Sequence, residues 1–368
     1  MRDATLPERS IWTEAEGGRT VVRFVDQLRL PAALETGTLR AWEEAEEAIR
    51  AMRLRGAPLI GVAGAYGLCL AVQADPSDLS LTAAAARLRA ARPTAVNLAR
   101  DVDGLAAELA PLPVAARPAA AWAWAEALAA QDVETNRWIG EHGLALIDEA
   151  ARRRPGGAPV RVLTHCNAGA LATVAHGTAT SPIYRAAGAG IPLHVWVSET
   201  RPRLQGAALT AWELGARGIP HQVIVDGAAA HLMQRGEVDL VVVGTDRTTR
   251  TGDVCNKIGT YAKALAAREH GVPFYAAVPS RSIDWTTRGG IAEIPIEERD
   301  PDEVLTATGI GRDGAPARLR VAAPGTRARN PAFDVTPAGL VTGLVTDRGR
   351  CAASEEGLLE LYPEERER

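Results

Sequence analysis

The chain has 368 residues, of which 46% are hydrophobic, and a formal net charge of −4. This length exceeds the usual size of one domain and the apolar content suffices for a sizeable core, so we expect two domains. Lysine and arginine are spread along the chain, which argues against a broad nucleic-acid surface but leaves room for a small local anion site. The four cysteines lie far apart without a CxxC pair, so reduced thiols are expected, and neither a disulfide scaffold nor a zinc knuckle.

The beginning of the sequence and its longest apolar stretch predict neither a signal peptide nor a membrane span. The first ten residues lack the apolar core of a signal peptide. Residues 59–72 are apolar but interrupted by glycines, and they fall short of the roughly 20 residues that cross a bilayer. We therefore expect a cytoplasmic protein without membrane contact.

The first third of the chain has the composition of a mostly helical layer. Residues 20–30 form a short amphipathic stretch that predicts small strands. Residues 38–52 and 83–110 are helical in composition, and Arg92-Pro93 breaks the second of these segments.

A boundary follows this layer. The Pro- and Ala-rich residues 111–118 are a candidate linker, and residues 119–153 predict a long helix that leads into the second half. We expect an N-terminal, mostly helical domain over residues 1–130 and a catalytic domain over residues 131–368.

Beyond residue 159 the pattern changes to short Val-rich runs separated by Ala-rich segments of helix length. The runs are RVLTH, HVWVSE, HQVIV, DLVVVGT and PFYAAV. This alternation predicts βαβ units and an α/β fold with a Rossmann-like parallel sheet buried on both faces. No GxGxxG motif follows the first strand, so we expect no NAD or FAD. We interpret Gly61, Gly64 and Gly67 as sites of close helix packing.

Two of the predicted strands end in residues suited to acid–base chemistry. Cys166 follows RVLTH, and Asp246 follows DLVVVGT. Ligands of open α/β sheets bind beyond the carboxyl ends of the strands, so a thiol and a carboxyl group there suggest an acid/base pair. A helix is expected to begin after Cys166, where it would lower the pKa of the thiol or orient it. His165 fits a structural role equally well, and the other three cysteines are expected to be inert.

Residues that could hold a phosphate are also present. The segment RGAP at residues 55–58 offers a guanidinium group and backbone N–H groups just before a predicted helix. Asn256 and Lys257 offer an amide and an ammonium group at what reads as another helix start. Arg92 and Gln205 could complete a polar clamp. Each residue alone is commonly a surface or capping residue, but the combination indicates an anion site.

Six segments with these residues resemble, in the same order and over nearly the whole chain, the methylthioribose-1-phosphate isomerase family. The segments are RGAPLIGVAGAYG (55–67), RPTAVNL (92–98), THCNAGALAT (164–173), ETRPRLQGAALTAWEL (199–214), GDVCNKIGTY (252–261) and NPAFDVTP (330–337). Thr245 and Ala168 depart from the family's usual Ala and Thr, and Thr248-Thr249 replaces a more aliphatic stretch. These departures leave room for altered selectivity at C5 of the sugar.

The resemblance implies an aldose–ketose isomerase of methionine salvage that converts 5-methylthioribose 1-phosphate to 5-methylthioribulose 1-phosphate. It implies a homodimer that uses a small-molecule sugar phosphate and needs no cofactor or metal. Cys166 and Asp246 match the catalytic pair. The matching substrate-binding positions are Arg55, Gly56, Ala57, Arg92, Gln205, Asn256 and Lys257.

Two alternatives stay open. The enzyme could isomerise 5-deoxyribose 1-phosphate or ribose 1,5-bisphosphate, which share the ring and the C1 phosphate. The family also shares a superfamily with regulatory subunits of a translation-initiation exchange factor, which bind partners without turnover.

Overall fold

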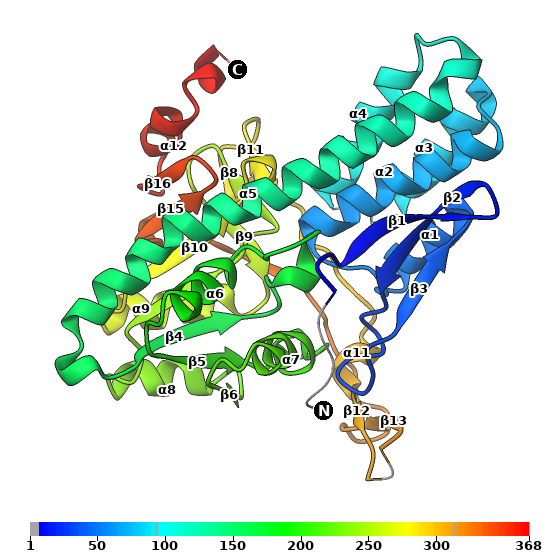
Figure 1. Ribbon diagram of the computed structural model, residues 1–368. Coiled ribbons are helices and arrows are strands. Elements are labelled where there is room, and N and C mark those ends of the chain that lie inside the picture. Colours follow the sequence, from blue (N-terminus) through cyan, green and yellow to red (C-terminus); the bar gives the residue numbers. More distant parts are fainter. Residues whose placement is uncertain (1–6, 93–94, 313, 368) are drawn as a thin grey trace.

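The computed structural model describes residues 7–92, 95–312 and 314–367, and two parts of the chain pack against the two halves of one long helix (Figure 1). The N-terminal part combines a three-stranded antiparallel sheet with four helices. Its elements are β1 (Ile11–Glu16), β2 (Arg19–Val25), β3 (Thr36–Leu39), α1 (Trp42–Arg50), α2 (Ala57–Ala74), α3 (Asp78–Ala90) and α4 (Val96–Leu109). The predicted break in the second helical segment is therefore confirmed, while Pro93 itself lies outside the described residues.

Helix α2 forms the centre of this part, because small residues let α4 approach it closely. A Cβ atom at Gly61 would lie 2.1 Å from the carboxylate of Asp101, and one at Gly64 would lie 2.5 Å from Leu98. The glycines are thus packing residues, as expected. Helix α2 is longer than the predicted apolar stretch and, by length and composition, could cross a membrane, but 78% of it is buried inside the protein. Such burial is typical of a core helix.

Helix α5 (Arg117–Arg153) joins the two parts and contributes to both cores. Its first half, up to Ala129, packs with the N-terminal helices, whereas residues from Ile139 onward pack against the C-terminal sheet. The predicted domain boundary after residue 130 lies inside this continuous helix. The division into two domains at that residue stays a prediction.

The C-terminal part is built on a seven-stranded sheet with the order β16-β15-β10-β7-β4-β5-β6. All neighbours pair in parallel except β16, which is antiparallel to β15. The strands are β4 (Val160–His165), β5 (Leu193–Ser198), β6 (His221–Ile224), β7 (Leu240–Val243), β10 (Phe274–Val278), β15 (Gly343–Thr346) and β16 (Gly349–Cys351). All five predicted runs are strands, and β15 and β16 extend the sheet beyond them.

Helices cover both faces of this sheet. Alternate residues such as Val162 and Leu163 enter different core clusters, one shared with α5 and α6 and the other with α8, α9 and α12. The covering helices include α6 (Ser181–Gly188), α7 (Ala211–Ala216), α8 (Ala228–Gln234), α9 (Thr260–Glu269) and α12 (Glu355–Leu361). The prediction of an α/β fold with a parallel sheet buried on both faces is confirmed.

A second, smaller sheet lies beyond the strand ends and was not predicted. Its order is β11-β8-β9-β14, with β8 (Arg247–Thr249), β9 (Val254–Lys257), β11 (Ile283–Asp284) and β14 (Phe333–Thr336). The chain between β11 and β14 also carries α10 (Gly290–Glu293), α11 (Asp302–Leu305) and a hairpin of β12 (Thr306–Ile310) and β13 (Pro316–Arg320). The hairpin extends away from the rest of the protein (Figure 1).

Candidate functional site

All nine residues predicted for the site line one cavity, which we call the site cavity. It contains about 990 Å³ of empty space, part of it open to solvent. The nine residues come from six separate segments of both parts of the protein. They are Arg55, Gly56, Ala57, Arg92, Cys166, Gln205, Asp246, Asn256 and Lys257.

Cys166 directly follows β4 in a backbone conformation that non-glycine residues rarely adopt, with φ of 65°. Two hydrogen bonds hold this turn: the Cys166 N–H donates to Thr200 Oγ1 at 2.8 Å, and Thr210 Oγ1 donates to the Cys166 carbonyl at 2.7 Å. The helix expected after Cys166 is absent from this stretch. A short 3₁₀ turn, Ala170–Ala172, follows instead, and the next α-helix begins only at Ser181.

Asp246 lies between β7 and β8, where its N–H donates to the Cys255 carbonyl at 2.9 Å. This bond ties the end of the large sheet to the small one and fixes the carboxyl group at the cavity wall. The predicted loop position of Asp246 is confirmed.

Burial dominates the electrostatics of the proposed pair. It raises the pKa of Asp246, although the cations Lys257 and Arg55 act in the opposite direction. It likewise raises the pKa of the Cys166 thiol, against the lowering effect of the same two cations. The expectation that a helix start lowers the thiol pKa is therefore wrong, because desolvation penalises the thiolate and no helix begins there. Both groups are biased towards their neutral forms.

The N-terminus of α2 faces the site cavity and has the features of an anion site. Gly56 caps the helix with φ of 107°, and a Cβ atom there would lie 2.5 Å from the backbone of Ala172, so only glycine fits. Ala57 and Pro58 open the helix. First-turn N–H groups have no intrahelical acceptors and sit at the positive end of the helix dipole, where they favour a phosphate.

Arg55 is buried beside this helix start and is held by Asn167. Its Nη1 donates to Asn167 Oδ1 at 2.5 Å and its Nη2 donates to the Asn167 carbonyl at 2.8 Å. The Asn167 amide in turn donates to Thr210 Oγ1 at 3.1 Å and to Glu213 Oε1 at 2.8 Å. Arg55 is thus held by Asn167, the residue that directly follows Cys166 in the sequence.

Asn167 and Glu213 were not among the residues predicted for the site. Glu213 is fully buried and also accepts from the N–H groups of Ala170 and Leu171, at 2.7 and 3.2 Å. It thereby shapes the loop after Cys166. The sequence contains one signal for this role: Glu213 is an ionisable residue within the apolar segment AWEL. A carboxylate that is buried there needs hydrogen-bond partners.

Asn256 and Lys257 lie at the end of β9, and not at a helix start as predicted. Helix α9 begins three residues later, at Thr260. The strand pairs with β14, and the Lys257 ammonium group lies 4.1 Å from the centre of the Phe333 ring. Burial lowers the pKa of Lys257, while Cys166 and Asp246 raise it. The contact with the Phe333 ring holds the Lys257 ammonium group at the cavity wall.

Arg92 and Gln205 have polar atoms that find no partner among the described residues. These are the Nε of Arg92 and the Oε1 of Gln205, both of which are buried. Buried polar atoms are nearly always hydrogen-bonded, so each points to an acceptor or donor that a ligand would supply.

The remaining candidates have structural roles. His165 is fully buried, and its Nε2 lies 2.8 Å from the Ile258 carbonyl. Burial and Lys263 lower its pKa to about 3, so the ring is neutral and is not suited to proton transfer at neutral pH. Cys255 lines the cavity, but burial raises its pKa to about 12. No metal-binding cluster of three or more His, Cys, Asp or Glu side chains occurs among the described residues.

Comparison with known proteins identifies the family. The model of the Initiation factor 2 subunit family matches residues 53–353. Methylthioribose-1-phosphate isomerases from Methylobacterium nodulans and Methylorubrum populi are 58% and 57% identical over 360 residues, covering 98% of this chain and of each relative. The chain belongs to the methylthioribose-1-phosphate isomerase family.

Solved structures agree with this membership. The crystal structure of 5-methylthioribose 1-phosphate isomerase from Pyrococcus horikoshii OT3 is 38% identical, covers 98% of this chain and 97% of its own, and has a TM-score of 0.82. The crystal structure of translation initiation factor eIF-2B, subunit delta, from A. fulgidus is 36% identical with a TM-score of 0.79, covering 97% and 100%. The isomerase family and the initiation-factor subunits therefore share this fold.

Proposed function

We propose that this protein isomerises 5-methylthioribose 1-phosphate to 5-methylthioribulose 1-phosphate in methionine salvage. One observation carries the proposal: Cys166 and Asp246 share a cavity with the cations Arg55, Arg92 and Lys257 in a chain 58% identical to a named isomerase. A thiol and a carboxyl group supply acid–base chemistry, and the cations supply a phosphate site.

The reaction assigns a separate task to each part of the cavity. A phosphate on the anomeric oxygen prevents the spontaneous ring opening of a free aldose, so the ring oxygen must receive a proton as its bond to C1 breaks. Asp246 is the donor, because burial raises the pKa of its carboxyl group and so favours the protonated form. Hydrogen then moves from C2 to C1 while the C2 hydroxyl loses its proton and becomes the ketone. Oxidation of C2 and reduction of C1 balance within one molecule, so the step needs no external oxidant.

Cys166 acts as the base or as a close-packed stabiliser of the intermediate. Burial raises the pKa of its thiol, so the resting group is neutral, and Arg55 and Lys257 are the groups that favour the thiolate. Two routes follow. A thiolate base would give an enediol, whereas a neutral thiol is compatible with a direct hydride shift.

The arrangement of charges favours an uncharged C5 substituent. A second cavity adjoins the site cavity and shares Met52, Arg55 and Gln205 with it. The other cations on its wall are each paired with a carboxylate. The pairs are Arg29–Glu35, Arg203–Glu303 and Arg318–Asp302. A second phosphate that entered this second cavity would have to displace one of these carboxylates, whereas a methylthio group or a plain methyl group would not.

Purified protein incubated with each of the three sugar phosphates, followed by phosphorus and carbon NMR, tests the proposal. We expect ketose from 5-methylthioribose 1-phosphate and none from ribose 1,5-bisphosphate. Conversion of none of them would reject the isomerase and leave the regulatory-subunit alternative. When the reaction is run in deuterated water, a high level of solvent deuterium at C1 of the ketose would support Cys166 as the base.

Three finer points are also proposed: a Rossmann-like classification of the sheet, a homodimer and a cytoplasmic location. Helices on both faces of a parallel sheet support the first. For the dimer, β6 forms an edge of the seven-stranded sheet, and Val223 on this strand and Val225 just beyond it are 45% and 61% exposed. An open apolar edge is a surface that a second chain would cover.

A further inference from the structure

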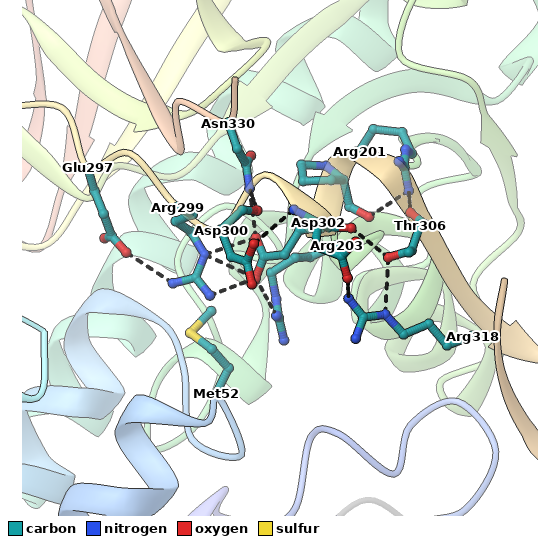
Figure 2. A network of polar contacts seen from close by, with 12 residues as sticks. Met52, Arg201, Arg203, Glu297, Arg299, Asp300, Asp302, Thr306, Arg318 and Asn330 are labelled. Atoms are coloured by element: carbon teal, nitrogen blue, oxygen red, sulfur yellow. Dashed lines mark hydrogen bonds and ion pairs between the residues drawn. The ribbon is translucent and has the colours of Figure 1, made fainter. Parts of the chain in front are cut away.

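A chain of alternating charges runs from the site cavity into the segment between α10 and α11. Arg92 Nη2 lies 2.9 Å from Glu297 Oε2, and the other oxygen of Glu297 accepts from Arg299 Nη1 at 3.0 Å. Arg299 Nη2 donates to Glu303 Oε1 at 2.7 Å, and Arg203 donates to the same oxygen at 2.8 Å. Figure 2 shows the contact between Glu297 and Arg299, with Arg203 in the same network. The chain thus connects Arg92 with the segment that carries Gln205, since Arg203 lies two residues before Gln205.

The hydrogen bonds of Arg92 leave one side of its guanidinium group for a ligand. Nη2 is held by Glu297, and Nη1 lies 2.9 Å from the sulfur of Met52, which is a weak acceptor. The buried Nε has no acceptor among the described residues. A phosphate oxygen would be a strong acceptor for this Nε–H.

Glu297 lies behind Arg92 and does not line the site cavity. Its side chain is 18% exposed. Burial would raise its pKa, but Arg92 and Arg299 lower it, so it carries a negative charge. Arg299, which is itself held by Glu303, fixes Glu297 through the carboxylate oxygen that Arg92 does not use. A fixed carboxylate can hold a long, flexible arginine in one rotamer before the substrate arrives.

We propose that Glu297 is the positioning residue for Arg92, fixing its guanidinium group so that Nε meets the C1 phosphate. This inference rests on the proposed function, because it takes the cavity anion to be that phosphate. The alternative, in which Glu297 only neutralises Arg92, makes the opposite prediction. Removal of a neutralising carboxylate would strengthen phosphate binding, whereas removal of a positioning carboxylate weakens it.

Two substitutions separate position from charge. Glu297→Ala removes both the hydrogen bond and the charge, and Glu297→Gln removes the charge but keeps an oxygen that accepts from Arg92. We expect Glu297→Ala to raise KM about tenfold with kcat changed less than about threefold, and Glu297→Gln to restore most of the wild-type KM. Glu298→Ala is the matched control, because Glu298 is the next residue but pairs with Arg329 and the N–H of Asn330. It should leave KM unchanged.

A double-mutant cycle with Arg92→Ala completes the test. If Glu297 acts through Arg92, Glu297→Ala should have no further effect on KM in the Arg92→Ala background. Binding of inorganic phosphate, measured by calorimetry, should follow the same order of variants and does not depend on turnover. Wild-type protein that binds phosphate but converts no sugar phosphate would reject the proposed function alone. Equal KM values for the Ala and Gln variants, or an undiminished effect of Glu297→Ala without Arg92, would overturn the role of Glu297.

Discussion

Substitution of Asn167 by alanine tests whether the loop after Cys166 is held as the structure indicates. Asn167 is buried and makes three side-chain hydrogen bonds, two of them to charged groups. It accepts from Arg55 and donates to Glu213 and Thr210. Alanine at this position removes the three hydrogen bonds but leaves their partners in place. The substitution therefore tests the hydrogen bonds and does not remove any other part of the loop.

The size of the effect follows from the contacts. Arg55 lines the cavity and keeps its bond to the Asn167 carbonyl, so water can replace the lost acceptor, at a cost of about 1.5 kcal/mol. Glu213 retains two backbone donors and the hydroxyl of Tyr184, which limits its cost to about 1.5 to 2 kcal/mol. Thr210 loses one neutral bond, worth about 0.5 kcal/mol. We therefore expect the free energy of unfolding to fall by about 4 kcal/mol.

Urea denaturation followed by circular dichroism measures this change. The matched control is Asn136→Ala, which removes another buried asparagine whose amide donates to the Asp132 carbonyl within α5, outside the cavity wall. We expect the control to lose about 1 kcal/mol, the value of a neutral bond. KM of Asn167→Ala should also rise, because Arg55 keeps only one anchor. A stability loss equal to that of Asn136→Ala would refute the proposed role of Asn167.

Four further predictions follow from the site and the surface. Cys166→Ser and Asp246→Asn should each slow turnover at least about 100-fold without unfolding the protein, and near-normal turnover in both would reject the pair. Lys257→Ala should weaken substrate binding by about 1.5 to 3 kcal/mol in a calorimetric titration of inactive Asp246→Asn protein; unchanged affinity would remove Lys257 from the phosphate site. Burial raises the pKa of Asp246 in the folded state, so the stability that its proton contributes is fully present below about pH 3.9 and is lost as pH rises through the folded pKa. The unfolding free energy of Asp246→Asn relative to wild type should therefore increase with pH over that window, and a constant difference would contradict the buried carboxyl group. Finally, sedimentation at micromolar concentration should give the mass of two chains, and the mass of one chain would reject the dimer.

The large sheet and its functional edge could be predicted because both are encoded locally. Each strand is a short Val-rich run, and the carboxyl ends of parallel strands meet at one edge. That rule alone brings Cys166 and Asp246 together although they lie 80 positions apart in the sequence. The anion site at the N-terminus of α2 could be predicted for the same reason, since the RGAP segment stands at the start of a long apolar helix.

The errors arise where distant contacts override local composition. Asn256 and Lys257 read as a helix start because a helical segment follows, but β9 pairs with β14, almost 80 residues later. After Cys166 the small residues suggest a helix, yet buried Glu213 accepts the N–H groups of Ala170 and Leu171 and holds them in a loop. Strand pairing and buried carboxylates depend on partners that local propensity does not reveal.

The role of Glu297 could not be predicted from the sequence for the same reason. It lies 205 positions from Arg92, in the charged run EERD, which reads as a solvated surface segment. Only the fold shows that a surface-like run turns inward to hold an arginine of the cavity.

The fold by itself does not separate an isomerase from an initiation-factor subunit, because solved structures of both kinds match this chain closely. The content of the cavity makes the distinction. Burial raises the pKa of the Asp246 carboxyl group, so keeping this group in the cavity costs stability at neutral pH that a partner-binding surface would have no reason to accept. An asparagine at position 246 would serve a partner-binding subunit better, since it needs no desolvated carboxyl group. The carboxyl group is useful only where its proton is transferred, and the sugar's ring oxygen is where the proposed reaction needs that proton.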